Sequence, residues 1–390
     1  MPIADKMVKM VDAASMIRKM FEEGIEMKEK FGADNVFDFS IGNPDVPPPA
    51  AVKNTLLELI NNESTSHGYM PNPGYPQVRK SVADYLNREF NVGLTQDLVV
   101  MTVGAAGALN DTLRALVNPG EDILVPAPYF VGYNQYAFVA AANLKTASTL
   151  PDFHLDLDAI KAAITEKTRV MLINSPNNPT GVVYTKKELQ GLGTLLEEAS
   201  QKFGKRIYLI SDEPYRKIVY GVEVPSVFDV YDHTIMLTSY SKELSLAGER
   251  IGYLSIHPKA EDAAMIAGAA GVANTMMYVN APALFQQVVG QLQGVTVDIS
   301  IYQKRRDMFC EGLFAAGYEF DVPEGAFYLF PKSPIENDLE FVGILKKQNI
   351  LAVPGTGFGG PGFFRLSYAV PEKTIIGSFE GFKKALDSVK

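Results

Sequence analysis

The sequence predicts an α/β protein, with a large domain built on a mainly parallel central sheet flanked by helices and a smaller α+β domain formed by both chain ends. From residue 98, short apolar runs alternate with helical patterns, which is typical of βα units on a parallel sheet. After about residue 285 this alternation stops and a long helical pattern begins. The length of 390 residues also suits two domains, which we expect at 48–285 and at 1–47 with 286–390.

The N-terminal segment predicts one helix over residues 7–31, followed by a strand at Val36–Phe39. The next loop contains Gly42 and three prolines at 47–49, so we expect it to be irregular and stiff. Because glycine lets a backbone approach a ligand closely, this loop is a candidate wall of a binding site.

The elements of the large domain follow from apolar runs and helical spacing. Two helices are expected before the sheet, at 50–61 and 74–90, and a Gly- and Pro-rich segment around Tyr69 separates them. The predicted strands are Leu98–Val103, Asp122–Val125, Val170–Ile173, Ile207–Ile210, Ile235–Thr238 and Gly252–Ile256. The clearest helices between these strands are Ala105–Val117 and Lys186–Phe203. The second helix is preceded by Thr185 with Glu188 three residues later, the pattern of a capping box.

The small domain contains fewer and less regular patterns. A long helix with a break near Gly294 is expected over residues 286–316, and it ends at Gly317. The remaining predicted elements are a strand at Gly325–Phe330, a helix at Leu339–Gln348, a strand at Phe363–Tyr368 and a helix from Pro371.

Composition excludes several classes of function. The formal net charge is -9, which argues against nucleic acid as a partner because phosphate backbones need a basic face. No apolar run approaches the roughly 20 residues of a membrane span, and the N-terminus lacks the apolar core of a signal peptide. Cys310 is the only cysteine, so we expect no intrachain disulfide and a cytoplasmic location. With four histidines and one cysteine, no metal site is expected.

Lys242 is the strongest candidate for catalysis. It follows an apolar run that reads as a buried strand, with Ser239 three residues before it and Arg250 eight residues after it. A lysine at the start of a loop is usually a solvated turn residue, but these neighbours are phosphate-binding groups. An amine beside a cationic phosphate site is suited to form a Schiff base with an aldehyde. Pyridoxal phosphate is an aldehyde that carries a phosphate and binds proteins through such a lysine.

Three other predicted strands end in residues that suit this cofactor. Ala105 and Ala106 begin a helix, whose free amides and positive dipole end favour an anion. Asn178 lies between prolines, which hold its side chain as a fixed hydrogen-bond group. Asp212 follows the most β-rich run, where α/β sheets place ligands, and there it can keep a pyridine nitrogen protonated. Tyr215 lies three residues further on. Considered singly, each has a common structural role, such as helix packing or capping.

Considered together, the four segments resemble the class I/II aminotransferases, pyridoxal-phosphate enzymes with the aspartate aminotransferase fold (fold type I). The resemblance rests on NSPNNPTG at 174–181, SDEPY at 211–215, SYSKELSLAGERIGY at 239–253 and FFRLSYA at 363–369. It extends from about Phe39 to the C-terminus. It implies an enzyme that transfers an amino group from an L-amino acid to a 2-oxo acid by a ping-pong mechanism, with pyridoxal 5'-phosphate as cofactor.

The resemblance also implies roles for single residues. Lys242 would carry the cofactor as a Schiff base and shuttle the substrate's α-proton, and Asp212 would pair with the pyridine nitrogen. The residues that would hold the ring oxygen are Tyr215 and Asn178. Those that would hold the phosphate are Ser239, Arg250 and the amides of Ala105 and Ala106.

Further roles concern the ring face, the substrate and a second subunit. Phe130 falls where the family stacks an aromatic side chain on the cofactor ring, and Tyr129 is the neighbouring alternative. Arg365 matches the arginine that grips the substrate's α-carboxylate, and Gly42 matches a small residue beside that carboxylate. Tyr69 matches the tyrosine that reaches the phosphate of the neighbouring subunit, which implies a homodimer with shared sites.

Two departures from the family concern specificity. Ala105 and Ala106 offer only amides where some relatives place a polar side chain. No counterpart is found for a second arginine that would bind a dicarboxylate, because the corresponding region, 274–278, is largely apolar. An apolar or aromatic amino donor, or a broad range of donors, therefore fits at least as well as aspartate.

Two alternative functions remain at this stage. The first is a carbon–sulfur β-lyase or related elimination enzyme on the same fold, since the shared motifs prepare the same chemistry at the α-carbon. The second is a transcriptional regulator that keeps an aminotransferase-like domain as a sensor. Such a regulator needs an added basic DNA-binding segment, and the first 35 or so residues of this acidic chain are too short for one.

Overall fold

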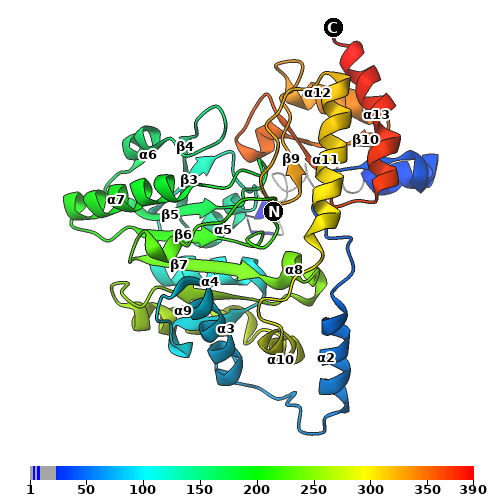
Figure 1. Ribbon diagram of the computed structural model, residues 1–390. Coiled ribbons are helices and arrows are strands. Elements are labelled where there is room, and N and C mark those ends of the chain that lie inside the picture. Colours follow the sequence, from blue (N-terminus) through cyan, green and yellow to red (C-terminus); the bar gives the residue numbers. More distant parts are fainter. Residues whose placement is uncertain (1–2, 5–6, 9–22) are drawn as a thin grey trace.

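The computed structural model describes residues 3–4, 7–8 and 23–390, and a seven-stranded sheet forms its centre (Figure 1). The strand order is β2-β8-β7-β6-β5-β3-β4. The strands are β2 Val99–Thr102, β3 Asp122–Ala127, β4 Asn143–Ser148, β5 Thr168–Asn174, β6 Tyr208–Asp212, β7 Thr234–Ser239 and β8 Gly252–Ile256. Only β8 runs antiparallel to its neighbours, β2 and β7. The predicted α/β class with a mainly parallel sheet is therefore confirmed.

Side chains of the central strands alternate between two apolar cores, one on each face of the sheet. On β5, Val170 and Leu172 face the core that includes α4, α5 and α9, whereas Met171 and Ile173 face the core that includes α3, α7 and α10. Burial on both faces explains why these strands read as continuous apolar runs. The helices of this part are α2 Ala50–Asn61, α3 Pro76–Phe90, α4 Gly104–Leu116, α5 Tyr133–Val139, α6 Leu157–Ala163, α7 Lys186–Phe203, α8 Tyr240–Glu243, α9 Ala263–Tyr278 and α10 Ala283–Gln291.

The second body combines both chain ends, as the sequence predicts. Strand β1 (Phe37–Asp38) pairs in parallel with β10 (Ile350–Leu351). Strand β12 (Phe364–Ser367) lies between β11 (Val353–Pro354) and β9 (Tyr328–Leu329) in an antiparallel sheet. Its helices are α11 Ile299–Ala316, α12 Asp338–Lys347 and α13 Glu372–Asp387. They enclose a separate aromatic core, in which the rings of Phe39 and Phe309 lie 4.8 Å apart.

Most expected elements are present, but three short or edge strands, β4, β10 and β11, were not predicted. Strand β4 was not predicted, because it is an edge strand with only one buried residue, Ala147, and so has no apolar run. The break expected near Gly294 is present: it separates α10 from α11, and Gly294 within it has a φ of 84°. The helix expected over 7–31 is described at 7–8 and over 23–31, and its middle lies outside the described residues. The capping box of Thr185 and Glu188 is present.

Helix α10 packs against α2 and α3, and residues of α3 and α10 belong to one of the two cores of the large sheet. The division of the chain at residues 285 and 286 stays a proposal.

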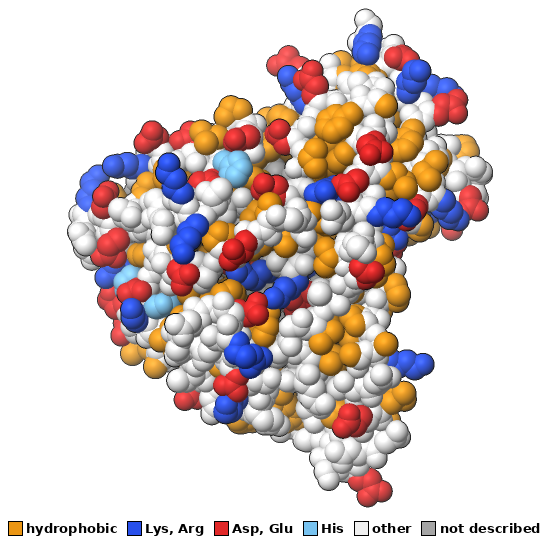
Figure 2. All heavy atoms as spheres, viewed as in Figure 1, with side chains coloured by type: hydrophobic (Ala, Val, Ile, Leu, Met, Phe, Trp, Pro, Cys, Tyr) orange, Lys and Arg blue, Asp and Glu red, His pale blue; other side chains and the backbone are white. Residues whose placement is uncertain are grey.

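The surface carries charges of both signs. On the face shown in Figure 2, Lys and Arg side chains are interspersed with Asp and Glu. In the described part of the chain, no helix has the length and apolar character needed to cross a membrane.

Candidate active site

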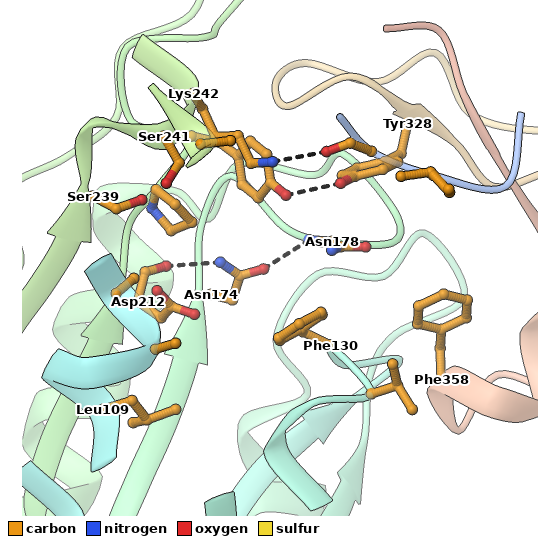
Figure 3. Close-up of a pocket in the computed structure, with 18 of the residues that line it drawn as sticks. Leu109, Phe130, Asn174, Asn178, Asp212, Ser239, Ser241, Lys242, Tyr328 and Phe358 are labelled. Atoms are coloured by element: carbon orange, nitrogen blue, oxygen red, sulfur yellow. Dashed lines mark hydrogen bonds between the residues drawn. The ribbon is translucent and has the colours of Figure 1, made fainter. Parts of the chain in front are cut away.

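The ends of the sheet strands and the second body enclose a cavity of about 400 Å³, within the range usual for small-molecule sites (Figure 3). Parallel strands β5 and β6 end at this cavity, and α4 and α8 begin beside it. The predicted site residues that line it are Gly42, Ala105, Ala106, Phe130, Asn178, Asp212, Tyr215, Ser239, Lys242, Arg250 and Arg365. Of the predicted set, only Tyr69 does not line this cavity.

Lys242 projects into the cavity from the short helix α8, directly after Ser239 ends β7. Its Nζ donates a hydrogen bond of 2.7 Å to the backbone oxygen of Gly42. Burial, together with the cations Arg365 and Arg250, lowers the pKa of Lys242 to about 8. The amine therefore has a substantial neutral fraction near neutral pH, as a nucleophile or base requires.

Asp212 is buried at the end of β6 and has one carboxylate oxygen available to a ligand. Tyr133 on α5 donates a hydrogen bond of 2.8 Å to Oδ2. Oδ1 is buried and has no hydrogen-bond partner among the described residues. Burial raises the pKa of Asp212 to about 7, so a cationic or protonated nitrogen placed at Oδ1 would stabilise the carboxylate.

Two asparagines connect this carboxylate strand to the arginine across the cavity. Asn174, at the end of β5, donates from Nδ2 to the backbone oxygen of Asp212 at 2.7 Å. Its Oδ1 accepts a hydrogen bond of 2.7 Å from the backbone N–H of Asn178. Asn178 Oδ1 in turn accepts from Arg365 Nη1 at 3.0 Å. Asn178 is thereby fixed in orientation, with its side chain at the cavity wall (Figure 3).

Arg365 on β12 is held by both hydrogen bonds and aromatic rings. Its Nη2 donates to the backbone oxygen of Ser40 at 2.7 Å. The guanidinium lies 4.6 Å from the ring centroid of Tyr328 and 4.7 Å from that of Phe358. Nε is buried without a hydrogen-bond partner among the described residues, so one donor of this guanidinium remains unpaired.

The opposite end of the cavity suits a phosphate. Helix α4 begins at Gly104, so the amides of Ala105 and Ala106 are among the free donors of its first turn. Arg250 Nη1 donates to the backbone oxygen of Ala247 at 2.9 Å. Gly104 has a φ of 68°, and a Cβ there would lie 2.8 Å from Arg250 Nη2. Glycine is therefore needed where the helix approaches the arginine.

Several aromatic residues of the site were not identified from the sequence. Tyr328, Tyr136 and Phe358 line the cavity, and Tyr133 lies behind its wall and donates a hydrogen bond to Asp212. Tyr328 also hydrogen-bonds Tyr215 at 2.9 Å. No short motif marks Tyr133 or Tyr328, because each acts through a partner far away in the sequence. The one sequence feature that could have pointed to Tyr133 is its position three residues after Phe130, a predicted site residue.

Tyr69 is 92% exposed and lies in the segment between α2 and α3. This segment is tied to α9, because Asn274 Nδ2 donates to the backbone oxygen of Asn72 at 3.2 Å. Met276, near the end of α9, is 75% exposed. An exposed tyrosine and an exposed apolar helix face therefore lie in connected segments.

The site fits pyridoxal phosphate on the evidence of its own atoms. It offers a depressed-pKa lysine, an unpartnered carboxylate oxygen and a helix N-terminus beside an arginine. These groups match the aldehyde, the pyridine nitrogen and the phosphate. In the described part of the chain, no three His, Cys, Asp or Glu side chains converge as a metal site requires.

Comparison with known proteins supports this chemistry. The family model for aminotransferase class I and II matches residues 34–376. A probable aspartate aminotransferase of Methanocaldococcus jannaschii is 29% identical, with 96% of each chain covered. The aspartate/prephenate aminotransferase of Thermus thermophilus is 32% identical, with 88% of this chain and 89% of the relative covered. The crystal structure of an aminotransferase from Eubacterium rectale has a TM-score of 0.96 at 38% identity and covers 100% of both chains.

Proposed function

This chain belongs to the class I and II aminotransferases, and we propose that its preferred amino donor is a neutral apolar or aromatic L-amino acid rather than aspartate. The enzyme uses pyridoxal 5'-phosphate and moves an amino group from an L-amino acid to a 2-oxo acid. The β-lyase alternative is not favoured, since the relatives are named aminotransferases.

We propose the following division of work among the residues. The bound cofactor supplies an electron sink for the carbanion at the substrate's α-carbon. Lys242 Nζ takes the α-proton, because its lowered pKa of about 8 leaves neutral amine available. Asp212 would accept a hydrogen bond at its unpaired Oδ1 from the protonated ring nitrogen, while Tyr133 keeps the carboxylate oriented through Oδ2. Arg365 binds the α-carboxylate through Nε and its remaining Nη donors.

The preference for a neutral donor rests on the cations of the cavity wall. Among the described lining residues these are Lys242, Arg250 and Arg365. Each has a proposed task already, at the α-carbon, the phosphate and the α-carboxylate. The apolar part of the wall includes Ile41, Phe130, Val131 and Phe358. A second carboxylate placed there would lose its hydration without gaining a cation, which is unfavourable.

The segments proposed to face a neighbouring subunit also lack a cation that could bind the second carboxylate of aspartate. These segments are those around Tyr69 and the end of α9. Residues 54–78 and 260–303 contain no lysine or arginine. We therefore use the relatives named for aspartate and prephenate to infer the type of reaction, and we do not infer the amino donor from them.

A donor panel tests this proposal. The holoenzyme is mixed with phenylalanine, leucine, methionine or aspartate, and kcat/KM is measured for each. We expect neutral donors to exceed aspartate by at least about tenfold, corresponding to about 1.4 kcal/mol in transition-state binding. Arg365→Met serves as the matched control, and it should weaken all donors alike because they share the α-carboxylate. A kcat/KM for aspartate equal to that of the best neutral donor would overturn the proposal.

We further propose a homodimer in which Tyr69 reaches the partner's phosphate site. The exposure of Tyr69 and of the apolar face of α9 supports this arrangement. A cytoplasmic location is proposed from the single cysteine, Cys310, which is free and buried.

A further inference from the structure

Two tyrosine hydroxyls form an isolated pair at the boundary between the two bodies of the molecule. Tyr215 follows β6 of the large sheet, and Tyr328 lies on β9 of the second body. Their hydroxyl oxygens are 2.9 Å apart, and both side chains are buried. A dashed line marks this hydrogen bond at Tyr328 in Figure 3. Neither hydroxyl has any other hydrogen-bond partner among the described residues.

Tyr328 is fixed by its surroundings. A Cβ at Gly42 would lie 1.9 Å from the Tyr328 hydroxyl, so the ring rests directly on the Gly42 backbone. The guanidinium of Arg365 covers the ring at 4.6 Å. Rotation of the hydroxyl away from Tyr215 would bury an unpaired polar group, which is costly.

Only a few charged or titratable groups among the described residues lie next to the two tyrosines. Tyr215 is surrounded by Lys242, whose Nζ is 6.0 Å from its ring centroid, and by the charges of Arg365 and Asp212. Tyr133 is the remaining titratable neighbour of Tyr215. Arg365 is the charged group beside Tyr328. None of these donates a hydrogen bond to the Tyr215 oxygen.

The direction of the hydrogen bond follows from proton counting. A phenol carries one proton, so a hydroxyl that donates to one acceptor can only accept from another donor. On the proposed role of Tyr215, its proton is donated to the cofactor's ring oxygen. Tyr328 must then donate to Tyr215. Hydrogen bonds in such a chain polarise one another, so each strengthens the next.

We propose that Tyr328 is a positioning residue, whose hydroxyl strengthens the hydrogen bond that Tyr215 donates to the cofactor's ring oxygen. This inference rests on the proposed role of Tyr215. The effect reaches the cofactor from β9, the neighbour of the strand that carries Arg365. Tyr328 therefore couples the substrate-carboxylate side of the site to the proton affinity of the bound chromophore.

The test is a pH titration of the visible absorbance of the holoenzyme. Tyr328→Phe keeps the ring, its packing on Gly42 and its contact with Arg365, and removes only the hydroxyl. With a weaker donor the ring oxygen's anion is less stabilised, so the apparent pKa of the chromophore should rise by about 0.5. Tyr215→Phe removes the donor itself and should raise the apparent pKa further.

A double-mutant cycle separates this mechanism from a general structural effect. In the Tyr215→Phe background, Tyr328→Phe should cause no additional rise, because its route to the cofactor is gone. Tyr220→Phe is the matched control, since it removes another buried tyrosine hydroxyl, which donates to the backbone oxygen of Ala326 at 2.6 Å. It should leave the apparent pKa unchanged.

Three results would overturn the inference in distinguishable ways. An unchanged apparent pKa in Tyr328→Phe would remove the strengthening effect. An equal rise from Tyr328→Phe with and without the Tyr215 hydroxyl would show that Tyr328 acts by another route. An unchanged value in Tyr215→Phe would refute the proposed role of Tyr215, while leaving the donor preference to its own assay.

Discussion

At the scale of single residues, the site contains an amine and a carboxyl group whose pKa values are both shifted toward neutral pH. Burial lowers the pKa of Lys242 to about 8 and raises that of Asp212 to about 7. Asp212 ends β6, and Lys242 lies on α8 directly after β7, which pairs with β6 in the sheet. A parallel sheet thus places a base and an acid at opposite parts of one bound ring, and burial alone sets much of their proton affinity.

The lysine predicts the pH dependence of cofactor addition. Only the neutral amine attacks an aldehyde, so the rate of pyridoxal phosphate addition to the apoprotein should rise with pH and level off above about 8. Stopped-flow absorbance measures this rate. Lys242→Ala should lack the reaction, and Arg365→Met should move the plateau to higher pH, because that cation lowers the lysine's pKa. A rate that keeps rising toward 10.5, the ordinary lysine value, would contradict this expectation.

The sequence identifies the residues that occupy short motifs but not those that support them. Lys242 and Asp212 were found because each follows a recognisable apolar strand. Tyr133 and Tyr328 were missed because they act through hydrogen bonds to residues 79 and 113 positions away. No local pattern encodes such a separation, and it depends on how the two bodies of the molecule pack.

At the scale of elements, predictability follows burial. Strands β5, β6 and β7 are buried on both faces and were predicted within two residues at each end. Strand β4 lies at the sheet edge and is mostly exposed, so its composition resembles that of a loop. The break between α10 and α11 was expected from Gly294. The packing of α10 against α2 and α3 was not expected, because helical spacing alone does not indicate which of the cores a helix joins.

Helix α4 carries a buried carboxylate that should make stability depend on pH. Asp111 is fully buried, and neither carboxylate oxygen has a hydrogen-bond partner among the described residues. Burial raises its pKa from 3.8 to about 7. The folded state therefore holds the proton that the unfolded state releases, and stability should fall as pH rises from about 4 to about 7.

Asp111→Asn keeps the shape of the side chain and removes its titratable carboxyl group. The variant should therefore become more stable relative to the parent as pH rises. We expect a relative gain of about 2 kcal/mol above neutral pH. The free energy of unfolding in urea, measured for both apoproteins below and above pH 7, gives the comparison. Asp84→Asn, on the exposed surface of α3, is the control and should leave the pH dependence nearly unchanged. Parallel pH profiles for Asp111→Asn and the parent would refute the expectation.

At the scale of the whole molecule, the surface around α9 suits assembly with a second chain. The α9 segment exposes Met265, Val272, Met276 and Val279, of which Met276 is 75% exposed. Tyr69, on a segment bonded to α9, is 92% exposed. Apolar side chains gathered on one helix suit a surface that another chain covers. A symmetric dimer places the same surface of both chains together.

Met276→Glu should therefore convert dimers to monomers, since it places a charge where the proposed interface excludes water. Light scattering after size-exclusion chromatography measures the mass directly. Ile376→Glu is the matched control, because Ile376 is a similarly exposed apolar residue, 55% accessible, on α13 of the second body. It should leave the dimer intact. Equal masses for the parent and Met276→Glu would count against this interface.

Subunit complementation tests whether the dimer shares its active sites. Lys242→Ala and Tyr69→Ala each disable a different half of every site if Tyr69 acts on the partner subunit. Co-expression then produces mixed dimers, in which one site combines Lys242 and Tyr69 from the two undamaged halves. Activity should recover to about one quarter of the parent's, because half of randomly paired dimers are mixed and one of their two sites is intact. If Tyr69 instead served its own chain, the mixture would show only the average activity of the two variants, and the shared-site arrangement would be wrong.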